Sequence, residues 1–359
     1  MICCIDCFQD IEIRAAIEMI GHKGNCPICK KTDTWLYDSI QDVDKTNIEE
    51  MLDSILEVYV PESCLPLSYP DEEKMPIEKR LLKDWKIFSD NVINIKQIVE
   101  GIVFESLDLD SRIITEPVGI PQLFDDVYLN DNSIMGKYNW NIFKKCLRNE
   151  NRFHNKYINL EMLELVLRET KITIPKDTKF YRARISDKKG YKRKEMWQPP
   201  DDIASAGRAN SKGQSCLYLC SNKKTTVKEI RARAFDYVTI ATFKLNRDVR
   251  VLDLSAIVHS SPFYYSGMDK IAYLVNEKNM RRIQDDMAKP VSRLDSELDY
   301  LPTQYISDFA KSLGYDGVKY FSTFDKTSYN VALFNSAACD CTYHRNFLIG
   351  DLEYKMTAI

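Results

Sequence analysis

The chain divides into two stretches with different hydrophobic patterns. From about residue 36 to 168, apolar residues recur every three or four positions, which is the period of an α-helix with one buried face. Further helical stretches pass through Trp140, Phe143 and Leu147 and then through 160–167. The clearest apolar stripe runs through Leu82, Trp85, Phe88, Val92, Ile95, Val99 and Ile102. This half of the chain therefore predicts a helical bundle.

After Ile174 and Pro175 the pattern changes to short apolar runs rich in aromatic and β-branched residues, which are typical of strands. These runs lie at 179–185, 216–220, 237–245, 249–254, 317–321 and 329–334. Helical patterns separate them at 225–235, 271–285 and 303–313. The second half therefore predicts an α+β domain with a mixed sheet, beginning near residue 170.

Composition and charge exclude several classes of protein. With 359 residues, of which 44% are hydrophobic and 29% charged, the chain can form two or three folded domains. The 50 basic residues are balanced by 53 acidic ones, so no global basic field favours nucleic acid as a partner. No apolar run is long enough for a membrane helix, and the first residues do not resemble a secretion signal. We therefore expect a cytoplasmic protein that does not bind membranes.

The first thirty residues hold five of the eleven cysteines. Cys4 and Cys7 form one Cys-x-x-Cys pair, and Cys26 and Cys29 form another after an amphipathic segment that stops at Gly21. Two such pairs offer four thiolates to one tetrahedral ion, which predicts a structural zinc site with all positions filled by protein. Two alternatives stay open, namely four buried reduced cysteines and the replacement of one ligand by Cys3 or His22.

Several polar residues of the second half stand out against the strand pattern. Arg182 lies inside a strand-like run, where a buried guanidinium is costly without an anionic partner. A loop with Gly207 and Arg208 leads to the run around Tyr218, and Glu229 lies on the helix predicted to begin near Ser221. Ser322 ends a later strand. Each residue taken singly also has a purely structural explanation. Arg182 could form an ion pair at an interface, Glu229 could lie on a solvated helix face, and Ser322 could be a turn residue at the end of a strand.

Together, and in this order, these segments resemble the RES domain, which is named for its Arg, Glu and Ser. The resemblance covers about residues 175–336 and includes the segment Gly-Tyr-Asp-Gly-Val-x-Tyr-x-Ser that ends at Ser322. It implies a fold similar to that of ADP-ribosyltransferases and an enzyme that cleaves NAD⁺ by hydrolysis or phosphorolysis. It implies Glu229, Arg182 and Ser322 as catalytic residues and Tyr218 and Arg208 as further substrate-binding residues. Ala209 departs from the family, which commonly has an aromatic residue there, and 188–194 and 201–213 look inserted.

The first half resembles a module often found before RES domains, in which a zinc-binding start precedes a HEPN-like helical region. The segment from Arg148 to His154 has the form of the HEPN ribonuclease motif, although a lone histidine is usually structural. We therefore expect a multidomain chain. Its parts are a Cys4 zinc module at 1–35, a helical HEPN-like domain at 36–170, an ADP-ribosyltransferase-like RES domain at 171–336 and a C-terminal tail at 337–359.

These features favour a RES-type toxin or defence effector that depletes NAD⁺ and is controlled by a neutralising or regulatory protein. One alternative is an ADP-ribosyltransferase that modifies a macromolecule, and another is a HEPN ribonuclease with the RES domain as a binding module. Val227 stands two residues before Glu229, where a second acidic group would activate an acceptor guanidine, so arginine-directed transfer is disfavoured. The sequence leaves the trigger and any oligomeric state open.

Overall fold

The computed structural model describes the chain except residues 91, 104–109, 256–260, 264–268, 290–296 and 351–359. Contacts between residues divide it into two compact units. The first comprises Met1–Lys137 and Ser260–Glu277, and the second comprises Tyr138–His259 and Lys278–Ile359. No helix among the described residues combines the length and apolar character needed to cross a membrane.

The first unit begins with a small sheet and one helix. The strands are β1 (Ile2–Cys4), β2 (Lys23–Gly24) and β3 (Thr34–Asp38), in the order β1-β3-β2. Helix α1 (Ile11–Ile20) begins where the Asp10 carboxylate accepts hydrogen bonds from the backbone N–H groups of Glu12 and Ile13. It ends at Gly21, whose φ of 83° is left-handed, so the predicted helix stop is confirmed.

The rest of the first unit consists of short helices and one small ladder. Its helices are α2 (Ile48–Leu56), α3 (Ile77–Asp84), α4 (Ile95–Val103), α5 (Arg112–Thr115) and α6 (Asp126–Asn132). Strands β4 (Val60–Pro61) and β5 (Val118–Gly119) pair antiparallel. The apolar stripe predicted through Leu82 to Ile102 is not one helix, because the chain leaves α3 after Asp84 and re-enters a helix only at Ile95.

The interruption has a physical cause in the N-terminal segment. The Ile87 carbonyl accepts hydrogen bonds from the N–H groups of Gln9 and Asp10, and Phe88 forms a bridge with Phe8. These bonds replace the helical ones that 85–94 would otherwise make. Trp85, Phe88, Val92, Ile95, Val99 and Ile102 are nevertheless all buried in the core of this unit. The spacing therefore identified core residues but not their backbone conformation.

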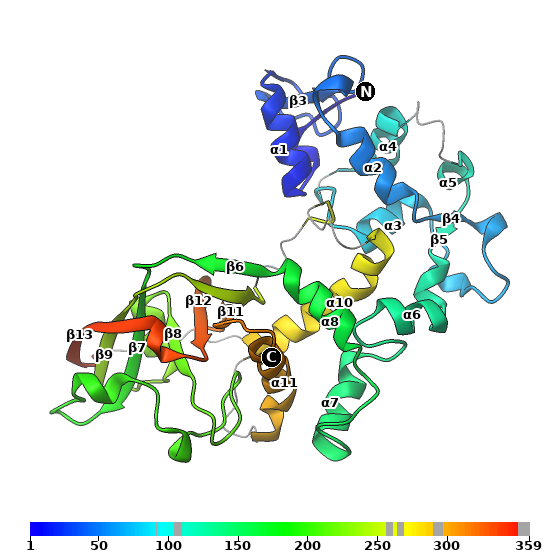
Figure 1. Ribbon diagram of the computed structural model, residues 1–359. Helices are drawn as coiled ribbons and strands as arrows, with labels where there is room; N and C mark the ends of the chain where they lie inside the picture. Colours follow the sequence, from blue (N-terminus) through cyan, green and yellow to red (C-terminus); the bar gives the residue numbers. More distant parts are fainter. Residues whose placement is uncertain (91, 104–109, 256–260, 264–268, 290–296, 351–359) are drawn as a thin grey trace. The chain divides into compact units, whose positions relative to one another are not determined.

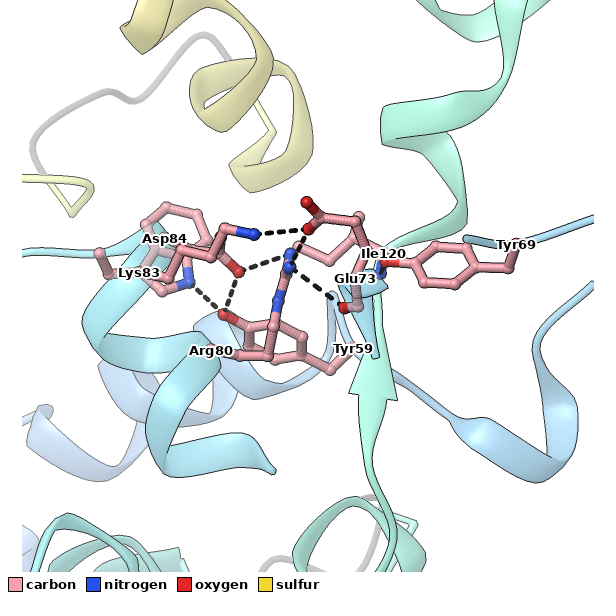
Figure 2. A network of polar contacts seen from close by, with 8 residues as sticks. Tyr59, Tyr69, Glu73, Arg80, Lys83, Asp84 and Ile120 are labelled. Carbon is pink, nitrogen blue, oxygen red and sulfur yellow. Dashed lines mark hydrogen bonds and ion pairs between the residues drawn. The ribbon is translucent and has the colours of Figure 1, made fainter. Parts of the chain in front are cut away.

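A fully buried arginine lies in this core, surrounded by polar partners (Figure 2). Arg80 forms ion pairs with Glu73 at 3.0 Å and with Asp84 at 2.8 Å. The Tyr59 hydroxyl donates to Asp84 and accepts a bond from the indole N–H of Trp85, both at 2.9 Å. Burial raises the pKa of Tyr59 and Asp84. The two carboxylates account for the buried guanidinium, so this network holds the core together and requires no ligand.

The second unit is built on an eight-stranded sheet in the order β13-β9-β7-β8-β12-β11-β10-β6 (Figure 1). The strands are β6 (Lys171–Ile174), β7 (Lys179–Ser186), β8 (Leu217–Cys220), β9 (Tyr237–Leu245), β10 (Val249–Asp253), β11 (Gly317–Ser322), β12 (Asp325–Leu333) and β13 (Cys339–Leu348). β10 and β11 run parallel, whereas the other pairs are antiparallel. The predicted mixed sheet is confirmed.

Helices precede the sheet in the chain and connect its strands. They are α7 (Trp140–Asn149), α8 (Leu160–Glu169), α9 (Lys223–Glu229), α10 (Lys270–Ala288) and α11 (Leu301–Ser312). Only the part of α10 from Lys278 onward belongs to this unit. α9 is shorter than the pattern at 225–235 predicted, because Arg231 adopts a left-handed φ of 52°. Its N-cap is Asn222 rather than Ser221. Glu229 is consequently the last residue of its helix.

The structure differs from the predicted division of the chain at two places. The compact units divide between Lys137 and Tyr138, well before the change of pattern near residue 170, and α7 packs through Phe143 on Tyr305 of α11. Residues 337–348 are not a tail, because β13 pairs with β9 along its length from Cys339 to Leu348. Both segments therefore complete the second unit.

Candidate active site and metal centre

Arg182 lies in the middle of β7 and is held between the neighbouring strands. Its Nη1 donates to the Tyr218 carbonyl at 3.1 Å, whereas its buried Nε has no hydrogen-bond partner. Desolvation by burial, followed by the charge of Arg184, lowers the pKa of Arg182 to about 10. The guanidinium remains charged at neutral pH. A partly buried charge with a buried, unpaired donor is costly, so this position calls for an anionic ligand.

Tyr218 lies on β8, and its hydroxyl holds the loop that contains Arg208. The hydroxyl donates to Asn210 Oδ1 at 2.6 Å and accepts a bond from the Ala209 N–H at 2.9 Å. A side chain at Gly207 would place its Cβ only 2.5 Å from the Tyr218 oxygen, so the close approach requires glycine. Burial raises the pKa of Tyr218 well above its usual range. Tyr218 is therefore a neutral phenol that fixes the loop.

Arg208 is held at the C-terminal end of α10. Its Nη1 donates to the Met287 carbonyl at 2.5 Å, and its Nη2 donates to the Lys289 carbonyl. A helix C-terminus carries partial negative charge and unpaired carbonyls, which suits a guanidinium. These contacts fix Arg208 without neutralising it by a carboxylate.

Glu229 ends α9 and points toward β11 and β12. Its Oε1 accepts hydrogen bonds from the Ser322 hydroxyl at 2.7 Å and from Asn330 Nδ2 at 2.8 Å. No described residue forms a hydrogen bond with Oε2, so this oxygen is available to a ligand. Two neutral donors on one oxygen hold the carboxylate in place.

These residues surround a cavity of about 410 Å³ in the second unit. Ser322 is only 3% exposed and lies behind Glu229 rather than on the cavity wall. The principal polar and aromatic residues of the wall are Arg182, Arg208, Tyr218, Glu229, Arg231, Tyr300, Tyr320 and Asn330. A single carboxylate opposite several guanidinium groups and tyrosine rings suits a ligand with a cationic centre, phosphate groups and flat rings.

The structure brings together the residues that the sequence predicted and adds Asn330. Asn330 lies on β12 opposite Tyr320 of β11 and Cys220 of β8. Its side chain is buried, although it belongs to an apolar strand. A polar residue at the start of the run Asn-Val-Ala-Leu-Phe is the signal that could have identified it. Ser322 is found beside Glu229, where its hydroxyl contacts the carboxylate.

The four N-terminal cysteines also come together. The Sγ atoms of Cys4, Cys7, Cys26 and Cys29 all lie within 4.8 Å of one another. Three of the separations are 3.8 Å (Cys4 to Cys7), 3.4 Å (Cys4 to Cys29) and 3.7 Å (Cys7 to Cys26). Zn–S bonds of about 2.3 Å place tetrahedral sulfurs roughly 3.8 Å apart. The cluster therefore has the dimensions of a Cys4 zinc site.

The alternative ligands do not belong to this cluster. Cys3 and His22 are not members of the four-residue group, and His22 Nε2 lies 3.7 Å from an Asp42 carboxylate oxygen. Hydrogen bonding from Cys7 lowers the pKa of Cys4 to about 5, and the same bond raises the pKa of Cys7. Four thiolates this close together repel one another, and a bound cation would offset that repulsion.

The two residues of the HEPN-like motif occupy separate environments. Arg148 is on α7 and forms an ion pair with Asp299. His154 is exposed in the loop after α7, where its backbone N–H donates to Asn151 Oδ1 at 2.9 Å. Neither contact joins the two side chains, and both contacts are typical of surface structure.

Comparison with known proteins identifies the class of the second unit. The model of the RES domain matches residues 179–355, so this part of the chain is a RES domain, as its motifs predicted. The match includes β13 and extends beyond the predicted end at 336. No curated relative matches the chain.

Comparison with solved structures finds chains that are similar to part of this one. One of them is a chain of the crystal structure of the M. tuberculosis MbcT-MbcA toxin-antitoxin complex, with 13% sequence identity and a TM-score of 0.33. The likeness covers 52% of the present chain and 91% of that chain. A likeness this remote assigns no role to any residue.

Proposed function

We propose that the protein cleaves NAD⁺ at the bond between nicotinamide and ribose. The observation that carries the proposal is the fixed Glu229 carboxylate, which shares a cavity with the partly buried and incompletely paired guanidinium of Arg182. Departure of nicotinamide leaves positive charge on the ribose, and a preorganised carboxylate stabilises such charge. The family resemblance of the second unit supports the same reaction.

Each residue of the cavity has a role that follows from its contacts. The free Oε2 of Glu229 accepts a ribose hydroxyl or faces the developing cation, while Ser322 and Asn330 orient the carboxylate through Oε1. Arg182 and Arg208 bind the phosphates through their planar forks. Tyr218 forms part of the wall against which the nicotinamide ring packs, with its hydroxyl occupied by the loop. Ser322 is thus proposed as a positioning residue.

An assay with NAD⁺ labelled in the adenosine half tests the proposal. Hydrolysis releases free ADP-ribose, and phosphorolysis releases its phosphorylated form only when inorganic phosphate is added. Label retained on a protein or nucleic acid would indicate the alternative ADP-ribosyltransferase. Intact NAD⁺ after incubation with folded protein would remove the proposed function.

The HEPN ribonuclease remains the second candidate, and His154 provides its test. We expect His154→Ala to cleave NAD⁺ at the rate of the parent, because this side chain is exposed and lines no part of the cavity at Glu229. Stability should change by no more than about 0.5 kcal/mol, as for other exposed positions. NAD⁺ turnover and cleavage of a labelled RNA are measured side by side. The ribonuclease would be favoured if the parent cleaves RNA, His154→Ala does not, and neither protein consumes NAD⁺.

We also propose that Cys4, Cys7, Cys26 and Cys29 bind one structural zinc ion. The support is the agreement of the three sulfur separations with a tetrahedral Cys4 site. With four protein ligands the ion would have no position for substrate, so its role would be in folding. The resemblance further suggests a cytoplasmic protein restrained by a neutralising partner and a HEPN-like role for the helices before the RES domain.

A further inference from the structure

A second cavity of about 400 Å³ lies in the second unit beside the one at Glu229. It is bounded by α7, by the end of α10 and by the segment that leads into α11. Its wall is rich in positive charge. The basic residues of the wall are Lys144, Lys145, Arg148, Arg208 and Lys289, and the acidic ones are Asp286 and Asp299.

The two carboxylates are engaged by two of the five cations. Lys144 forms an ion pair with Asp286 at 2.8 Å, and Arg148 forms one with Asp299. Asp286 also accepts a hydrogen bond from the Trp140 indole at 2.6 Å, which fixes α7 against the end of α10. These contacts stabilise the wall of the cavity. The other three basic residues, Lys145, Arg208 and Lys289, can contact a ligand.

Among the residues that the structure describes, no carboxylate neutralises three positive charges of the wall. Lys145 and Lys289 form no ion pair with any residue that the structure describes. Within the described part of the chain, the side chain of Arg208 donates hydrogen bonds to the carbonyls of Met287 and Lys289 and to no carboxylate. The excess of three cations over the engaged pairs makes this cavity a site for an anion.

The two cavities are neighbours, since Arg208 and Tyr300 line both of them. A dinucleotide has the matching shape, because two nucleosides are joined by an anionic diphosphate. With the nicotinamide riboside half at Glu229, the diphosphate would pass Arg208 and the second nucleoside would enter the basic cavity. The cavity at Glu229 provides the carboxylate for the ribosyl cation, and the basic cavity adds Lys145 and Lys289 beyond Arg208 for the phosphate on the far side of the diphosphate.

We propose that the basic cavity binds the adenosine phosphate half of the dinucleotide and that Lys145 contacts its phosphate. The inference rests on the proposed cleavage of NAD⁺. Lys145 belongs to α7, which precedes the RES match at 179–355. The helical segment before the RES domain therefore supplies part of the substrate site and sets the preference for a dinucleotide over a mononucleotide.

The test compares Lys145→Glu with Lys188→Glu, which makes the same charge change at an exposed turn outside both cavities. Loss of this charge-assisted contact should raise the KM for NAD⁺ about tenfold or more. The kcat should stay close to that of the parent. The KM for nicotinamide mononucleotide, which lacks the adenosine half, should not change, and Lys145→Arg should restore the KM for NAD⁺.

Calorimetric titration with ADP gives a second result that does not depend on cleavage. The folded parent and Lys188→Glu should bind ADP, and Lys145→Glu should bind it about tenfold more weakly. Absence of ADP binding by the parent overturns the inference, whether or not NAD⁺ is cleaved. Equal effects of Lys145→Glu on both nucleotide substrates, or an effect on neither, overturn it as well. A parent that binds ADP but leaves NAD⁺ intact would reject the proposed reaction and retain the basic cavity as a nucleotide site.

Discussion

Glu229→Gln should lower the kcat for NAD⁺ cleavage a hundredfold or more while leaving the protein folded. This factor corresponds to roughly 2.7 kcal/mol of lost transition-state stabilisation. Glutamine retains the shape of the side chain and an acceptor oxygen for Ser322 and Asn330. It loses the negative charge, which is the property that stabilises ribosyl cation character. Binding of NAD⁺ should therefore suffer less than turnover.

A solvated helix residue would behave differently. If Glu229 were such a residue, the substitution would change stability by no more than about 0.5 kcal/mol and leave turnover intact. Steady-state kinetics of the folded variant, with circular dichroism as the check on folding, separate the two cases. A kcat near that of the parent would remove Glu229 from the mechanism and most of the proposed function with it.

Ser322→Ala provides the matched comparison for Glu229→Gln. The carboxylate keeps its charge and its bond from Asn330, and loses only the hydroxyl donor at 2.7 Å. We expect a smaller fall in kcat than in Glu229→Gln and little change in KM, because the hydroxyl orients Glu229 and does not line the cavity. A rise in KM with unchanged kcat would instead indicate direct contact with substrate.

The sequence predicted the candidate site because its residues belong to segments with clear local patterns. The strand patterns around Arg182 and Tyr218 correspond to β7 and β8, and the order of the motifs indicated the RES domain. The contact between Glu229 and Ser322 could not be predicted, because 93 positions separate them. Their meeting depends on α9, which lies against β7 and β8, placing its last residue within reach of β11. The early end of α9 could not be predicted either. A left-handed residue at a helix end is usually glycine, whereas here it is Arg231.

The regions outside the motifs show why periodicity alone is not enough. The stripe identified buried residues from Trp85 to Ile102, although its first residue, Leu82, is exposed. Hydrogen bonds from Gln9 and Asp10 to the Ile87 carbonyl interrupt the predicted helix. β13 was missed because it is an edge strand with mostly exposed side chains and lacks a continuous apolar run. In both cases the conformation depends on a partner segment far away in the sequence.

Replacement of Cys26 by serine should abolish zinc binding and unfold the N-terminal part of the first unit. Cys26 is 2% exposed, and its sulfur lies 3.7 Å from that of Cys7. Structural zinc contributes an apparent 10–16 kcal/mol to the folding of zinc-finger peptides, which exceeds the stability of a small module held by α1 and three short strands. Purified parent protein should contain about one zinc ion per chain, whereas the variant should contain none.

Cys64→Ser is the matched control, because Cys64 is exposed and lies outside the four-sulfur cluster. It should keep the zinc content and the slow hydrogen exchange of β1, α1 and β3 that Cys26→Ser loses. Exchange in β7 and β9 should remain slow in both variants, since these strands belong to the other compact unit. Zinc release should also increase as the pH falls, because protons compete with the ion for the thiolates. A folded parent without metal, or a Cys26→Ser protein that retains zinc and slow exchange, would show that the four cysteines are packed as thiols and that the first unit folds without an ion.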